Sequence, residues 1–134
     1  MDNKFLIGLI CLSVTIPAMG QASREIIEGC WAEGAHPVMA VCVERYARAT
    51  ELVLAKTENA TLAKFSMSAD NSASRAKVKK ALLSSSQTFR AYRLAECRFR
   101  DVVASSGNAS ESLKLACEAE LNEARIARLN ELSQ

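Results

Sequence analysis

Four cysteines spread between residues 30 and 117 constrain this chain more than any other feature of its sequence. They are Cys30, Cys42, Cys97 and Cys117. A fifth, Cys11, lies in an apolar N-terminal stretch with the pattern of a secretory signal peptide, and the small residues Gly20 and Ala22 suit cleavage after Ala22. Removal of residues 1–22 would expose the other four thiols to an oxidising compartment, where pairing is expected. We therefore expect a periplasmic or secreted protein, typical of a Gram-negative envelope.

Residues 23–134 are expected to form a single helical domain. From Val38 to Ser106 there is no Gly and no Pro, and the residues that lose least on entering a helix dominate. One helix of that length would run about 100 Å, so the Ser-, Asp- and Asn-rich segment 66–74 must interrupt it. The pattern predicts an all-α antiparallel bundle of three main helices, stapled by disulfides. Their expected ranges are 37–65, 72–104 and from the turn at Gly107 to 132, after a short helix over 23–32.

Apolar residues at spacings of three and four predict which face of each helix is buried. The expected core positions are Met39, Cys42, Tyr46, Ala49 and Val53, then Val78, Leu82, Phe89, Tyr92, Phe99 and Val103, and finally Leu113, Cys117, Leu121 and Ala124. After residue 22 no stretch is apolar enough to be a transmembrane segment.

The cysteine spacing limits the possible disulfides without choosing among them. Residues equidistant from a hairpin turn lie level with each other, and Gly107 is the midpoint of Cys97 and Cys117. Cys30 and Cys42 are likewise centred beside Pro37, so two sequential bridges fit. Cys42 is also level with Cys97 if the preceding turn centres near residue 70, so a Cys42–Cys97 bridge stays open. A Cys₄ zinc site is disfavoured, because the short cysteine pairs of such sites are missing.

The sequence offers no catalytic or cofactor motif. The lone histidine, His36, lies in a polar turn, and the chain has neither a nucleophile elbow nor a phosphate-binding glycine loop. The carboxylates of the last helix indicate a solvated acidic face rather than an acid–base pair. We therefore expect no enzyme activity, no cofactor and no metal site.

The helix expected over 72–104 has an unusual charge. Residues 75–100 contain eight basic side chains and one acid, while both flanking segments are net negative. Neutralisation by the acidic neighbouring helices, with a local Glu96–Arg100 pair, is one interpretation. The other is a surface for an anionic partner formed by Lys77, Lys79 and Lys80. Nucleic acid is disfavoured as that partner, because the protein is expected to be exported.

Several residues resemble one known family. An aromatic at Phe89, an arginine one helical turn later at Arg93, the pair Glu96-Cys97, the polar turn over 105–108 and then Cys117 are similar to the LprI-type lysozyme-inhibitor domain. Upstream, Cys30, Cys42 and Tyr46 resemble its N-terminal cysteine pair. The resemblance covers residues 28–132. It implies an exported helical protein with Cys97–Cys117 and Cys30–Cys42 bridges. Arg93 follows Phe89 by one helical turn beside the expected core face, so we expect these two to be structural residues.

The resemblance also implies a protein partner. The main expectation is a periplasmic inhibitor that occludes a lysozyme-like muramidase through the polar tip before its last helix. This tip is composed of Ser105, Ser106, Gly107 and Asn108. One alternative is an immunity-type protein that neutralises a delivered envelope toxin. The other is an envelope adaptor that binds anionic polymer or lipid through Lys77, Lys79 and Lys80. The sequence specifies neither the target nor the oligomeric state.

Overall fold

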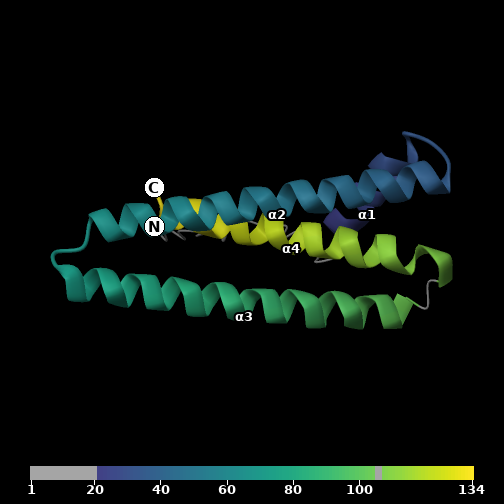
Figure 1. The fold of residues 1–134 in the computed structure, drawn as a ribbon. Helices are drawn as coiled ribbons and strands as arrows, with labels where there is room; N and C mark the ends of the chain where they lie inside the picture. Colours follow the sequence, from purple (N-terminus) through teal and green to yellow (C-terminus); the bar gives the residue numbers. More distant parts are fainter. Residues whose placement is uncertain (1–20, 105–106) are drawn as a thin grey trace, which may run out of the picture.

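A computed structural model describes residues 21–104 and 107–134, and Figure 1 shows their arrangement. The elements in order are α1 (Gln21–Trp31), α2 (His36–Met67), α3 (Ser72–Ala104), a 3₁₀ turn (Gly107–Ala109) and α4 (Ser110–Leu132). The expected all-α antiparallel bundle, with three long helices and a short first one, is confirmed. Most of the expected signal peptide, residues 1–20, and the tip residues Ser105 and Ser106 lie outside the described residues.

Polar side chains separate α2 from α3 at the expected place. The Ser68 hydroxyl and backbone N–H both donate to the Lys64 carbonyl, at 3.0 and 3.2 Å, which closes the last turn of α2. The Asn71 side-chain oxygen accepts from the Ser74 N–H at 2.9 Å and caps the start of α3. At the other connection Gly107 has φ +49°, a left-handed conformation that glycine adopts without strain.

The helices are arranged around a central pair. Helices α2 and α4 pack along each other, and α3 runs antiparallel to α2 on one side of them (Figure 1). Helix α1 is confined to one end, where it packs on both α2 and α4. The α3–α4 connection is at that same end, which we call the α1 end, and the α2–α3 connection is at the other, which we call the hairpin end.

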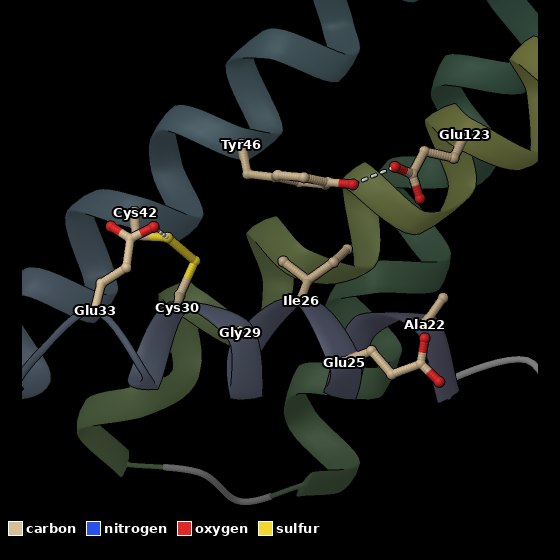
Figure 2. Close-up of a pocket in the computed structure, with 9 residues that line it drawn as sticks. All are labelled: Ala22, Glu25, Ile26, Gly29, Cys30, Glu33, Cys42, Tyr46 and Glu123. Carbon is tan, nitrogen blue, oxygen red and sulfur yellow. Dashed lines mark hydrogen bonds between the residues drawn. A yellow bond between two sulfur atoms is a disulfide. The ribbon is translucent and has the colours of Figure 1, made fainter.

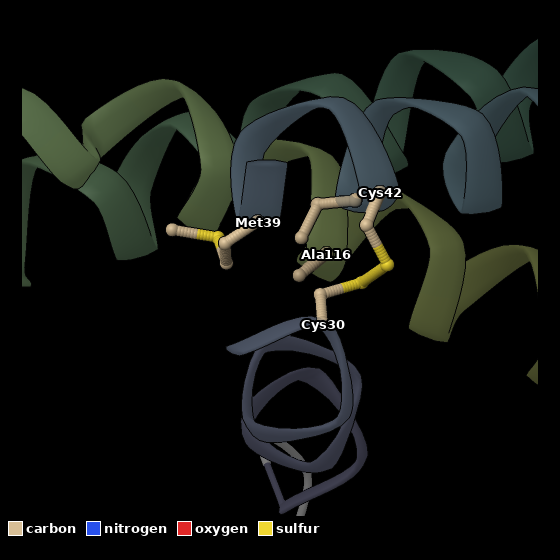
Figure 3. Packing of buried hydrophobic residues seen from close by; sticks show 5 residues of the cluster. Cys30, Met39, Cys42 and Ala116 are labelled. Atoms are coloured by element: carbon tan, nitrogen blue, oxygen red, sulfur yellow. A yellow bond between two sulfur atoms is a disulfide. The ribbon is translucent and has the colours of Figure 1, made fainter. Parts of the chain in front are cut away.

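Both disulfides lie at the α1 end, in the apolar core. Cys30–Cys42 joins α1 to α2 and Cys97–Cys117 joins α3 to α4, each with Cα atoms 5.6 Å apart. The first is packed with Met39, Val43 and Ala116 (Figure 3). The second is packed with Leu121 and Phe89. The two sequential bridges are thus confirmed, and the Cys42–Cys97 alternative is excluded.

The predicted buried faces were only partly right. Met39, Cys42, Cys117 and Leu121 are buried as expected, but Tyr46, Ala49, Val53, Tyr92, Phe99, Val103 and Ala124 are exposed. On α2 the buried face continues instead through Val43, Ala47, Thr50, Leu54, Glu58 and Thr61. An apolar pattern passes over the polar members of this face, since Glu58 and Thr50 are buried with bonds from Arg90 and Asn122 on other helices.

Charged and amide groups hold the middle of the bundle together. Arg93 of α3 donates to the carboxylate of Glu51 on α2 and to the side-chain oxygen of Asn122 on α4. The Asn122 amide in turn donates to the Thr50 hydroxyl at 3.3 Å. One turn earlier, Arg90 pairs with Glu58 at 2.9 Å. This Arg93 cluster, composed of Arg93, Glu51, Asn122 and Thr50, joins all three long helices.

The ionisation of Glu51 is stabilised by these contacts. Partial burial alone would raise its pKa, but the hydrogen bond and charge of Arg93, with the charge of Arg90, lower the pKa below its usual 4.5. The guanidinium of Arg93 also lies 5.9 Å from the centre of the Phe89 ring, which adds a cation–π contact to its hydrogen bonds.

Replacing Arg93 with alanine should therefore destabilise the fold. The side chain is only 14 % exposed, and its loss leaves Asn122 and Glu51 without their shared donor. The free energy of unfolding should fall by about 1–3 kcal/mol in chemical denaturation. Arg98→Ala is the matched control, because Arg98 is exposed on the same helix, and it should change stability by less than about 0.5 kcal/mol. An Arg93→Ala variant that unfolds like the wild type but no longer binds a partner would make Arg93 a contact residue instead.

Candidate functional site

A groove beside the first disulfide is the most distinctive surface feature of the α1 end. It has a volume of about 450 Å³ and is lined by α1, α2 and α4. Three carboxylates, those of Glu25, Glu33 and Glu123, surround it, and Tyr46 and the Cys30–Cys42 bridge form its wall (Figure 2). We call it the acidic groove.

The groove exists because α1 is held against the central pair. A helix of 11 residues is too short to be stable alone in water. Cys30 ties α1 covalently to α2, and the Ser23 hydroxyl donates to Glu120 of α4. Ile26 and Ile27 pack against the apolar cluster around the disulfide. The side chains of α1 are thereby fixed relative to α2 and α4.

The three carboxylates differ in their partners. Glu33 forms an ion pair with Arg45 at 3.1 Å, with both side chains largely exposed. Glu123 accepts a hydrogen bond from the Tyr46 hydroxyl, which raises the pKa of Tyr46 to about 12, with burial and the Glu123 charge adding to the effect. Glu25 makes no hydrogen bond or ion pair with any residue that the structure describes. The groove therefore presents negative charge to solvent.

Glycine at position 29 keeps one wall of the groove open. A Cβ atom built on Gly29 would meet no atom within 4 Å. A larger side chain at this position can therefore enter the groove without displacing the backbone. This makes Gly29 a suitable site for blocking the groove by substitution.

The whole α1 end is acidic and the hairpin end is basic. Residues 21–50, 96–104 and 107–123 contain ten acidic and six basic side chains, a net charge of −4. Residues 51–95 and 124–134 contain four acidic and ten basic side chains, a net charge of +6. The charge asymmetry seen in the sequence is thus an end-to-end polarity of the bundle.

The two surfaces expected from the sequence lie at opposite ends. Gly107 is exposed and lies with Asn108 in the 3₁₀ turn at the α1 end. Ser105 and Ser106 are outside the described residues. Lys77, Lys79 and Lys80 are exposed near the start of α3, at the hairpin end. The acidic groove and the expected tip therefore share one end.

Neutralisation accounts for only part of the basic charge on α3. Arg90 and Arg93 pair with Glu58 and Glu51, and Arg100 pairs with Glu96 at 2.9 Å and with Glu120 at 3.0 Å. The expected Glu96–Arg100 pair is thus confirmed. Arg98 forms no ion pair within the described part of the chain, and neither do four side chains near the start of α3: Arg75, Lys77, Lys79 and Lys80. We call these four the basic cluster.

Sequence reasoning missed the acidic groove. Glu25, Glu33 and Glu123 form no motif, and Tyr46 was assigned to the core. The cysteine spacing was the available signal, since a Cys30–Cys42 bridge folds α1 back onto α2. Among the described residues, no three potential metal-ligating side chains are grouped closely enough to hold an ion.

Comparison with known protein families decides the relationship. A family model described as lysozyme inhibitor LprI matches residues 30–129. The chain belongs to the LprI lysozyme inhibitor family. The matched segment contains all four bridged cysteines and the Arg93 cluster, whereas Glu25 and Gly29 precede it. No curated protein and no solved structure matches the chain.

Membership of the LprI family, an inhibitor family, suggests a lysozyme as the protein partner. It also suggests an extracytoplasmic protein, which fits the two disulfides. No helix in the described ranges combines the length and the apolar character required to cross a bilayer.

The Tyr46–Glu123 contact predicts a measurable titration. In a Tyr92→Phe background, which leaves Tyr46 as the only tyrosine, the phenol should ionise near pH 12 rather than near pH 10 when followed by tyrosinate absorbance. Because the folded pKa is raised, the contact stabilises the fold fully below pH 10, and this contribution is lost as the pH rises through 12. Glu123→Gln should return the pKa toward 10. Ionisation near pH 10 with Glu123 present would contradict the contact.

Proposed function

We propose that this protein binds and inhibits a lysozyme-like muramidase from its α1 end, by steric occlusion of the glycan cleft. The observation that carries the proposal is the position of the acidic groove at the same end as the exposed Gly107 turn. Family membership supports a lysozyme as the partner. The groove and turn suggest how such a partner would be engaged.

Charge supports the choice of end. Common lysozymes are strongly basic, and complementary charge speeds encounter and excludes wrong partners. The protein as a whole offers no such attraction, because its net charge is +2. The α1 end alone is acidic, and Glu25, which has no partner among the residues that the structure describes, lines the groove. A basic enzyme would therefore approach the α1 end first.

Shape supports occlusion. The long helices present continuous cylindrical faces, whereas the turn that contains Gly107 is narrow and polar. A turn of this kind can enter a cleft that binds sugar and can offer hydroxyl and amide groups there. One side of α1 lines the acidic groove. Its other side faces Arg100, Asp101 and Leu113 of α3 and α4. In this proposal the turn enters the sugar-binding cleft of the lysozyme, while the acidic groove contacts the basic surface around that cleft.

Blocking the groove tests the proposal without disturbing the fold. Gly29→Arg should place a long cationic side chain in the groove and abolish inhibition in a cell-wall lysis assay. Gly29→Ala is the matched control, because its small side chain leaves the groove open and helix propensity favours alanine by up to about 1 kcal/mol. Replacement of Ser106, Gly107 and Asn108 should also abolish inhibition, with the melting temperature lowered by only a few degrees. Full inhibition by both Gly29→Arg and the turn variant would contradict the proposal.

A second candidate function rests on the basic cluster. Basic side chains near a helix N-terminus oppose the helix dipole, and the cluster has no carboxylate partner among the described residues. Such a surface suits an anionic envelope polymer or lipid. Reversal of Lys77, Lys79 and Lys80 to glutamate should leave muramidase inhibition unchanged if the α1 end is the inhibitory surface. Loss of polymer or vesicle binding in that variant, with salt-sensitive binding in the wild type, would favour the adaptor function.

A further inference from the structure

The outward face of α3 carries large apolar side chains that are left exposed by every other segment the structure describes. Tyr92, Phe99 and Val102 are 46 %, 64 % and 70 % exposed. They lie on the face opposite the buried Ser86 and Cys97, so they point away from α2 and α4. Contiguous exposed apolar residues on one face of a helix mark an interaction surface rather than a solvated one.

This face has the repeat of a coiled-coil seam. Ala81, Ser85, Thr88, Tyr92, Ala95 and Phe99 follow one another at alternate steps of four and three residues, and Val102 continues the pattern. All of them are exposed. Alternate steps of three and four keep side chains facing a single partner helix over several turns. We call these seven positions the α3 seam.

The side chains of the α3 seam are small in its first half and large in its second half. Its first half contains Ala81, Ser85 and Thr88, whereas its second half contains Tyr92, Phe99 and Val102. When two such helices pack in antiparallel orientation about a two-fold axis near residue 90, the large half of each meets the small half of the other. Phe99 then faces Ala81 of the second copy, and Tyr92 faces Thr88. In a parallel pair the two Phe99 side chains would instead meet each other.

From this complementarity we propose that two copies of the chain form an antiparallel homodimer through the α3 seam. The charges favour the same orientation. The α1 end has a net charge of −4 and the hairpin end +6, so antiparallel packing places opposite charges side by side at both ends of the dimer. Parallel packing would place like charges together.

The size of the seam sets the strength of the dimer. The helix between residues 81 and 102 runs about 33 Å, which gives an interface near the lower limit of about 1,200 Å² for specific complexes. Because interfaces of this size include many transient complexes, a micromolar concentration series is the appropriate range for a test. The seam is on the far side of α3 from the acidic groove, which α1, α2 and α4 form, so the dimer leaves both grooves open. The dimer is thus independent of the proposed inhibition.

Sedimentation velocity of the oxidised chain over a micromolar concentration series tests the proposal. The wild type should associate to a dimer, and Phe99→Glu should weaken dimerisation at least about tenfold. Its melting temperature should not fall below that of the dissociated wild type. Leu52→Glu is the matched control, because Leu52 is 73 % exposed on α2, outside the seam, and it should dimerise like the wild type.

A double variant tests the orientation. Phe99→Glu combined with Ala81→Lys places opposite charges face to face twice in an antiparallel dimer, so dimerisation should recover relative to Phe99→Glu alone. In a parallel dimer the same pair would oppose like charges and give no recovery. A wild-type chain that stays monomeric throughout the series, equal dimerisation of Phe99→Glu and wild type, or no recovery in the double variant would each overturn the proposal.

Discussion

Two disulfides at one end of the bundle are the constraint on which the rest of the structure depends. Cys30–Cys42 and Cys97–Cys117 close loops of 12 and 20 residues, and a bridge of this kind contributes on the order of 3 kcal/mol in the chain-entropy model. The first packs on Ala116 of α4 and the second includes the neighbouring Cys117, while Ala116 and Ala119 are both fully buried. Without the first bridge, α1 would be held only by noncovalent contacts such as the Ser23–Glu120 hydrogen bond and the packing of Ile26 and Ile27. Loss of α1 from the bundle would remove one wall of the acidic groove.

Away from the disulfides, the helices are held together more by polar contacts than by apolar packing. Only a few large apolar side chains are buried in the hairpin half, and Leu54 and Leu129 are two of them. Arg90 and Arg93 connect α3 to carboxylates of α2, and Asn122 completes the contact from α4. Such groups hold the helices in one register, because a shift of one turn would leave buried charges unpaired. The charge polarity of the bundle follows the same two halves. Acidic groups lie around the disulfides, and basic groups lie beyond the Arg93 cluster, toward the hairpin end.

Much of the fold could be predicted because it rests on local signals. The Ser- and Asn-rich break, the glycine turn and the helix-forming composition act within a few residues, so α3 begins at Ser72 and ends at Ala104 as expected. The buried faces were harder, because the core of α2 includes Glu58 and Thr50, which are buried only through partners on other helices. Phe99 and Tyr92 resembled core residues for the opposite reason, since an apolar seam has the same spacing whether it faces its own chain or another.

Sequence reasoning did not find the acidic groove, because its carboxylates come from three segments that the Cys30–Cys42 disulfide and α4 bring together. Hydrogen exchange of the oxidised protein, with and without a basic lysozyme, tests the central claim that the α1 end is the binding surface. The account predicts slower exchange in peptides that cover residues 22–33 and 107–112, and unchanged exchange over 72–82. Protection confined to residues 72–82, with the α1 end unchanged, would contradict it.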